Sequence, residues 1–87
     1  MTKHCKVYMN YFGYGEQDVI LCEACGRPAV DIHHINGRVG EDANKIENLM
    51  ALCRKCHTKA HEGKLSKGEL QYIHNNFLLG NRKQFIK

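Results

Sequence analysis

The order of hydrophobic and polar positions predicts two short strands in the centre of the chain. Residues 30–33 alternate apolar and polar side chains, which is the period of a half-buried strand. Residues 49–52 form a second apolar run, and the polar stretch 36–44 between them contains two glycines. We therefore expect an antiparallel hairpin with a long connecting loop.

Two helices are predicted after the hairpin. Residues 54–62 favour a short helix that Gly63 ends. Ser66 and Glu69 have the spacing of a capping box, which predicts the start of a second helix that Gly80 ends. Its apolar residues recur with helical period: Leu70, Ile73, Phe77 and Leu78. The pattern predicts a small α+β fold in which the additional C-terminal helix covers one side.

The flanking segments are expected to belong to the same small unit. Residues 1–15 mix four aromatic side chains with two glycines, which suggests an arm that packs on the core. Residues 18–21 form a short apolar approach to the first cysteine pair. We expect an N-terminal arm at 1–21, a core at 22–63, and a C-terminal helix with a basic tail at 64–87.

Composition indicates that such a fold needs a covalent or metal staple. A chain of 87 residues buries too small a core to rely on hydrophobic packing alone. Its five cysteines and six histidines could supply either disulfides or metal ligands. Neither a secretory leader nor a membrane span is visible, so we expect a cytoplasmic protein in a reducing compartment, which favours metal.

Four cysteines form two matched pairs, Cys22-x-x-Cys25 and Cys53-x-x-Cys56. Each pair can present two thiolates to one tetrahedral ion from a tight turn, so the spacing predicts a structural Zn²⁺ site. A thioredoxin-like dithiol would need only one such pair, at a helix start after a strand. Cys5 is left over and is expected to be a reduced thiol.

Histidines form a second group. His57 and His61 are four residues apart on the expected helix, so both rings can reach one ion from one face. The same pair alone would also fit two surface histidines. His33 and His34 end the first expected strand, and Asn48 precedes the second.

The order of these residues resembles the HNH, or ββα-metal, endonuclease family. The likeness covers residues 22–61, with several linked spacings. The histidine doublet and the step from Asn48 to His57 are similar to those of colicin nuclease domains. The four-cysteine frame is similar to that of small HNH proteins from phages and restriction systems.

The resemblance implies a role for each of these residues. His34 matches the general base and His33 the metal ligand before it, because the alternative register would put the ligand at Ile32, which cannot bind a cation. His57 and His61 match the remaining ligands of the catalytic ion. Asn48 matches the asparagine that braces the loop carrying the base.

The implied reaction is metal-dependent hydrolysis of DNA phosphodiester bonds, leaving 5′-phosphate and 3′-hydroxyl ends. His34 would take a proton from the attacking water. An all-histidine site favours Mn²⁺, Ni²⁺, Co²⁺ or Zn²⁺ by affinity, whereas Mg²⁺ or Mn²⁺ is usual in the family.

Two further polar residues have open roles. Asp31 shares a strand face with His33 and could orient that ring or simply be solvated. Asn44 competes with Asn48 as the bracing amide, but the fixed step to His57 favours Asn48. Asn44 is then more simply a turn residue.

The charge pattern suits a polyanionic partner, since the formal net charge is +4 and the isoelectric point is about 8.9. Arg38, Arg54, Lys55 and Lys59 are candidate phosphate contacts, with Arg38 as a clamp from the long loop. We expect double-stranded DNA, weak sequence preference, and specificity borrowed from a second copy or another protein.

Two rival interpretations keep the metal frame but not the reaction. The first is a non-catalytic zinc module that binds nucleic acid or protein, and it makes the histidines incidental. The second is a metal-storage or sensor protein, which needs no ordered strand and helix placement. The joint occurrence of base, ligands and Asn48 favours the nuclease.

Overall fold

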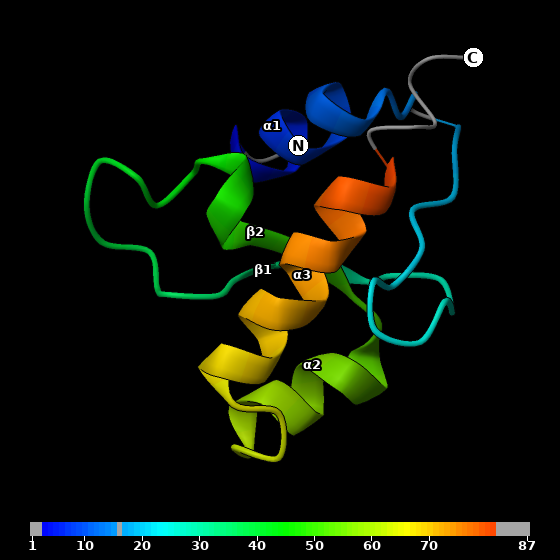
Figure 1. Cartoon of the computed structure of the whole chain (residues 1–87). Helices are drawn as coiled ribbons and strands as arrows, with labels where there is room; N and C mark the ends of the chain where they lie inside the picture. Colours follow the sequence, from blue (N-terminus) through cyan, green and yellow to red (C-terminus); the bar gives the residue numbers. More distant parts are fainter. Residues whose placement is uncertain (1–2, 16, 82–87) are drawn as a thin grey trace.

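A computed structural model describes residues 3–15 and 17–81 of the chain (Figure 1). The basic tail at 82–87 lies outside these described residues. The elements are α1 (Lys3–Phe12), β1 (Asp31–His34), the 3₁₀ turn η1 (Ile46–Asn48), β2 (Leu49–Leu52), α2 (Arg54–His61) and α3 (Lys67–Asn81). The consecutive β1, β2 and α2 form the predicted ββα unit, and the small α+β fold is confirmed.

The two strands form an antiparallel pair in which His33 lies opposite Met50 and His34 lies opposite Leu49. The first strand begins one residue later than the apolar pattern predicts. Val30 still donates its N–H to the Leu52 carbonyl at 3.0 Å, so the extended pairing reaches back to it. All of β2 is buried because both faces of the hairpin are covered.

Two hydrophobic clusters cover the two faces of the hairpin. One gathers α1 against Ile32, Leu49 and Ala51. The other gathers the cysteine region and the first turns of α3 against Met50 and Leu52. Figure 1 shows α1 above the strands, α2 below them and α3 running across both levels. Successive side chains of β1 therefore point alternately toward the face beneath α1 and toward the face that carries the cysteines.

The long helix α3 joins these two clusters. Leu70, near its start, packs in the cluster that contains the cysteines, whereas Phe77 and Leu78, near its end, pack in the cluster beneath α1. The predicted capping box is present, since Glu69 N–H donates to Ser66 Oγ at 3.1 Å and Ser66 N–H donates to Glu69 Oε1 at 3.3 Å. Gly80 lies inside α3, which the structure describes as far as Asn81, so the predicted stop at Gly80 is not seen.

The short helix α2 starts and ends as the sequence predicts. Cys53 is its N-cap, and the Cys53 sulfur accepts a hydrogen bond from Cys56 N–H. Gly63 follows the helix with φ of +78°, a left-handed conformation that glycine adopts without strain. The second cysteine pair thus sets the position of α2 directly.

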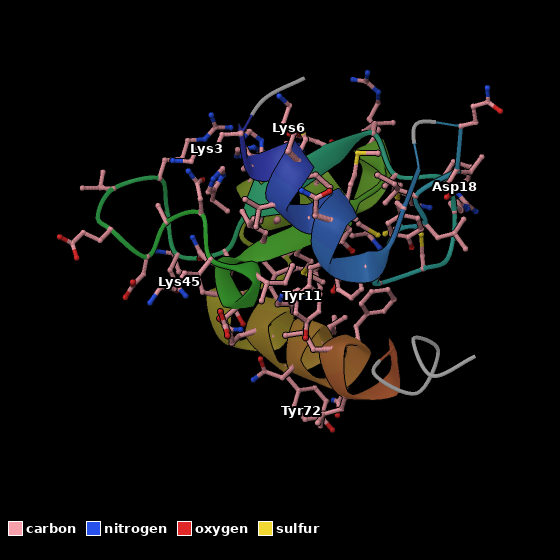
Figure 2. The ribbon with its side chains drawn as sticks, turned by 90° about the horizontal axis from the view of Figure 1, so that it is seen from above. Lys3, Lys6, Tyr11, Asp18, Lys45 and Tyr72 are labelled. Atoms are coloured by element: carbon pink, nitrogen blue, oxygen red, sulfur yellow. The ribbon has the colours of Figure 1, made fainter. Side chains whose placement is uncertain are left out.

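The N-terminal helix lies across the hairpin and presents basic side chains to solvent. Viewed from above, Lys3 and Lys6 extend outward from α1, and Lys45 lies on the neighbouring loop (Figure 2). Tyr8 and Phe12 face inward and are buried. None of the helices in the described part of the chain is long and apolar enough to cross a membrane.

Candidate functional site

The four paired cysteines meet in one cluster. Their sulfur atoms all lie within 4.8 Å of one another, and the sulfurs of Cys25 and Cys53 are 3.5 Å apart. A tetrahedral ion with Zn–S bonds of about 2.3 Å requires sulfurs about 3.8 Å apart, so the cluster has the size and donor set for zinc. Cys5 lies on α1, outside this cluster.

A backbone hydrogen bond favours thiolate at Cys53, whereas burial raises the pKa of Cys56 to about 12. The Cys56 N–H that caps α2 points at the Cys53 sulfur and lowers the pKa of Cys53 to about 6. A metal ligand must be deprotonated, so this cysteine is in the ligand form at neutral pH. The same hydrogen bond connects the cluster to the helix that carries His57 and His61.

Three histidines gather between the end of β1 and the face of α2. The ring centroids of His33 and His57 are 5.2 Å apart, those of His33 and His61 are 6.0 Å apart, and those of His57 and His61 are 4.5 Å apart. Among the described residues, the four cysteines are the group whose ligating atoms lie close enough together to hold one metal ion, and the ring nitrogens of the three histidines do not meet in this way. The hairpin register and the spacing on α2 together create this histidine cluster.

The surroundings of His33 favour its neutral imidazole form. Burial, together with the neighbouring His57 and His61, lowers the pKa of His33 below 6.5, against a smaller opposing effect of Asp31. A neutral ring has a lone pair available for a cation. The sequence leaves the role of Asp31 open, and in the structure its Oδ2 lies 3.7 Å from His57 Nε2, so its ion-pair contact is with His57.

His34 points to the opposite side of the hairpin, beneath α1. Its Nε2 lies 3.0 Å from Asn44 Oδ1, and the His4 ring packs on it with 4.6 Å between ring centroids. Its Nδ1 is buried and has no hydrogen-bond partner within the described part of the chain. A buried ring nitrogen without a partner is unusual in a folded protein and marks a candidate reactive group.

Asn48 ties together the two ends of the loop that follows His34. Its Oδ1 accepts from Asn36 N–H at 2.7 Å, and its Nδ2 donates to the carbonyls of Gly37 at 3.1 Å and Ala43 at 2.8 Å. The side chain is buried, so its amide replaces water for all three backbone groups. This is the contact pattern of a loop brace.

A cleft of about 380 Å³ adjoins the end of β1. Both His33 and His34 contribute to its lining, although their side chains leave the strand on different faces. Lys67, at the start of α3, lies at the same cleft. The cleft therefore adjoins both histidine positions at the end of β1 and one cationic side chain, while the His34 ring itself is buried on the other face.

The predicted phosphate-binding residues are all exposed. Arg54, Lys55 and Lys59 project from α2, and Arg38 lies on the loop between the strands. Arg38 is close enough to His4 to help lower the pKa of His4, after burial and the effect of His34. The exposed cations thus come from two elements, α2 and the loop between the strands.

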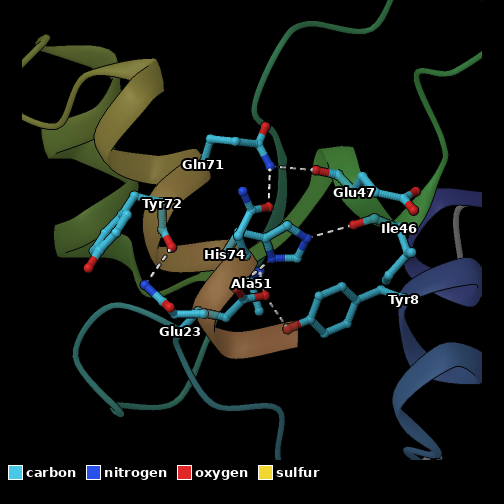
Figure 3. A network of polar contacts seen from close by, with 10 residues as sticks. Tyr8, Glu23, Ile46, Glu47, Ala51, Gln71, Tyr72 and His74 are labelled. Carbon is cyan, nitrogen blue, oxygen red and sulfur yellow. Dashed lines mark hydrogen bonds and ion pairs between the residues drawn. The ribbon is translucent and has the colours of Figure 1, made fainter. Parts of the chain in front are cut away.

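A buried polar network was not predicted from the sequence (Figure 3). His74 Nδ1 lies 2.6 Å from Glu23 Oε1, and His74 Nε2 lies 2.6 Å from the Ile46 carbonyl. Tyr8 donates its hydroxyl to Glu23 Oε2 at 2.6 Å, and Ala51 N–H donates to the same oxygen at 3.3 Å. The network joins the first cysteine turn to α1, α3 and β2. The available signal was a histidine on the apolar stripe, four residues after Leu70.

Comparison with known proteins gives a family for this arrangement. The family model of HNH endonucleases matches residues 22–63, which include the cysteine cluster, the hairpin and α2. Residues 22–63 are therefore similar to the HNH endonuclease family, and the four-cysteine cluster lies within this matched segment.

Two curated relatives are similar to this chain. A mitochondrial DNA mismatch repair protein mutS homolog from Sarcophyton glaucum is 35% identical over 51 residues, which are 52% of this chain and 5% of that protein. The type IV methyl-directed restriction enzyme EcoKMcrA of Escherichia coli (strain K12) is 27% identical over 71 residues, 70% of this chain and 26% of that enzyme. The chain thus spans a small part of either relative. No solved structure matches it significantly.

Proposed function

We propose that this chain is a metal-dependent DNA endonuclease that hydrolyses phosphodiester bonds, leaving 5′-phosphate and 3′-hydroxyl ends. The observation that carries the proposal is one cleft lined by both His33, from the histidine cluster, and His34, which has an unpartnered ring nitrogen. A hydrolytic site needs a base and an electrophilic centre beside one substrate position. The HNH family match and the similarity to a restriction enzyme support the same reaction.

His33, His57 and His61 are the residues that would hold the catalytic ion. Their donor set suits a divalent metal, and the lowered pKa of His33 keeps that ring in the ligand form at neutral pH. When bound, a divalent cation such as Mg²⁺, Mn²⁺, Ni²⁺, Co²⁺ or Zn²⁺ polarises the phosphate and stabilises charge on the leaving oxygen.

His34 is the proposed general base. Its unpartnered Nδ1 would accept a proton from the water that attacks phosphorus, and general base catalysis of this kind contributes on the order of a hundredfold or more. Asn48 supports this role by bracing the loop that starts after His34. The four cysteines would hold a structural zinc ion that positions α2 and takes no part in the chemistry.

The proposed substrate is double-stranded DNA contacted through its phosphates. Arg38, Arg54, Lys55 and Lys59 are exposed cations beside the site, and phosphate contacts of this kind read little sequence. Specificity would then come from a second copy or another protein. A reducing cytoplasm, in a bacterium or a phage-infected host, would keep the cysteines available for zinc.

Cleavage of plasmid DNA tests the proposal. The zinc-loaded protein should nick or linearise plasmid with Mn²⁺ or Mg²⁺, and EDTA should stop it. His34→Ala should abolish cleavage while zinc content and DNA binding stay unchanged. Tyr72→Ala, at an exposed position on α3, is the matched control and should cleave like the parent.

Two results would contradict the proposal. Cleavage by His34→Ala at the parent rate would remove His34 from the mechanism. DNA binding without cleavage under any divalent ion would instead favour a non-catalytic zinc module.

A further inference from the structure

We propose that Asn44 is a positioning residue that holds the ring of His34 with its Nδ1 lone pair free for the reaction. This inference rests on the proposed nuclease function and adds a residue to it. The sequence alone favours a turn role for Asn44. The structure places Asn44 in a turn and adds a second role, because the Asn44 side chain reaches the base directly.

The first step of the argument is the chemistry of the contact. Asn44 Oδ1 lies 3.0 Å from His34 Nε2, and an amide oxygen can only accept a hydrogen bond. Nε2 must therefore carry the hydrogen. A neutral imidazole has one N–H, so Nδ1 is left with a lone pair, and Nδ1 is the buried nitrogen without a partner.

The second step is how the ring is held in place. His34 is 7% exposed, with Leu49 opposite it on β2 and the His4 ring against it. These neighbours restrict the ring by packing. Asn44 supplies the hydrogen bond to the ring within the described part of the chain, and a hydrogen bond discriminates between the two ring nitrogens, whereas packing does not.

The third step separates the two asparagines. Asn48 binds only backbone, and one of its partners is the carbonyl of Ala43, the residue before Asn44. Its other partners follow His34 along the chain. Asn48 thus holds the two sides of the loop at a fixed distance. At that distance the Asn44 side chain can reach the His34 ring.

Asn44 lies in a turn, since Lys45 N–H donates to the Asp42 carbonyl at 3.2 Å, but a turn role alone does not account for its side chain. Among the described residues, every residue with positive φ is a glycine, so Asn44 is not in the left-handed conformation that favours asparagine in turns. Its side chain is half-buried and faces His34.

Nitrogen NMR of the zinc-loaded protein with isotopically labelled histidine tests the positioning directly. The resonances of His34 are assigned by their loss in His34→Ala. The parent should show a single neutral form of His34 with hydrogen on Nε2, Asn44→Leu should mix the two tautomers, and Asn44→Asp should preserve the parent form. An unchanged tautomer in Asn44→Leu, or hydrogen on Nδ1 in the parent, would overturn the inference.

Cleavage kinetics give a second readout. Asn44→Leu should lower kcat roughly tenfold to a hundredfold, the range seen when a functional histidine loses its orienting partner, while KM for DNA stays unchanged. Asn44→Asp should recover most of the rate because it keeps an acceptor oxygen. Asn10→Leu, at an exposed position on α1, is the control and should behave as the parent.

The outcomes distinguish this inference from the proposed function. Equal losses in Asn44→Leu and Asn44→Asp, with a matching fall in thermal stability, would make Asn44 a structural loop residue and overturn the inference. If the parent cleaves no DNA, the proposed function fails, and the NMR experiment still decides whether Asn44 fixes the ring of His34.

Discussion

The buried contact between His74 and Glu23 allows a quantitative test of what holds this small domain together. Both side chains have an exposed fraction of 0%, and both nitrogens of the His74 ring face acceptors. His74→Leu fills similar space but removes both hydrogen bonds. It leaves the Glu23 carboxylate buried with only Tyr8 and Ala51 as donors.

The expected loss is large for a chain of this size. Removing one partner of a buried ion pair costs about 3–5 kcal/mol, because the other charge is left without compensation. Domains of this length have a total free energy of unfolding on the order of 5–15 kcal/mol. His74→Leu should therefore lose roughly a fifth or more of the stability and lower Tm by more than about 10 °C.

Urea and thermal unfolding of the zinc-loaded protein, followed by circular dichroism, measure this loss. Tyr72→Ala lies on the same helix but is exposed, and it should change the free energy of unfolding by about 0.5 kcal/mol or less. A His74→Leu protein within about 1 kcal/mol of the parent would refute the argument that the network is a main support of the fold.

The difference in free energy of unfolding between the parent and His74→Leu should become smaller as the pH rises. Burial is the largest single influence on the pKa of His74 and lowers it, but the hydrogen bond and charge of Glu23, with the Ile46 carbonyl, outweigh burial and raise the pKa above 6.5. The folded state then binds the proton more tightly than the unfolded state. The stabilisation is full below pH 6.5 and is lost as the pH rises through the higher folded pKa, so the gap between parent and His74→Leu should narrow in alkali.

Three further predictions concern the loop, the cysteine cluster and the cationic surface. Asn48→Ala loses three hydrogen bonds and should destabilise the protein by about 2–4 kcal/mol in urea unfolding, with slower plasmid cleavage because the loop after His34 loosens; unchanged stability would contradict the bracing role. Cys25→Ser should lose zinc, measured by metal analysis, and unfold at lower temperature; a parent protein whose helicity survives zinc chelation would argue against a structural metal. Lys59→Gln should weaken DNA binding equally for all sequences and reduce the slope of log K against log salt by about 0.9 in anisotropy titrations, whereas an unchanged slope would remove Lys59 from the interface.

The sequence by itself was sufficient for the local parts of this protein. The hairpin, the helix α2 with Gly63 after it, and the capping box of α3 follow from short-range rules of backbone geometry and side-chain period. The two cysteine pairs could be joined into one cluster because their fixed spacing leaves few other uses for four thiolates.

Only the tertiary structure decided how residues from different elements contact one another. Asn44 reaches His34 from ten residues away, Asp31 lies beside His57, and His74 meets Glu23 from 51 residues away. None of these contacts has a period or a fixed spacing in the sequence. They arise where separate elements pack, because a buried polar group must find its partner among whichever side chains the fold brings near.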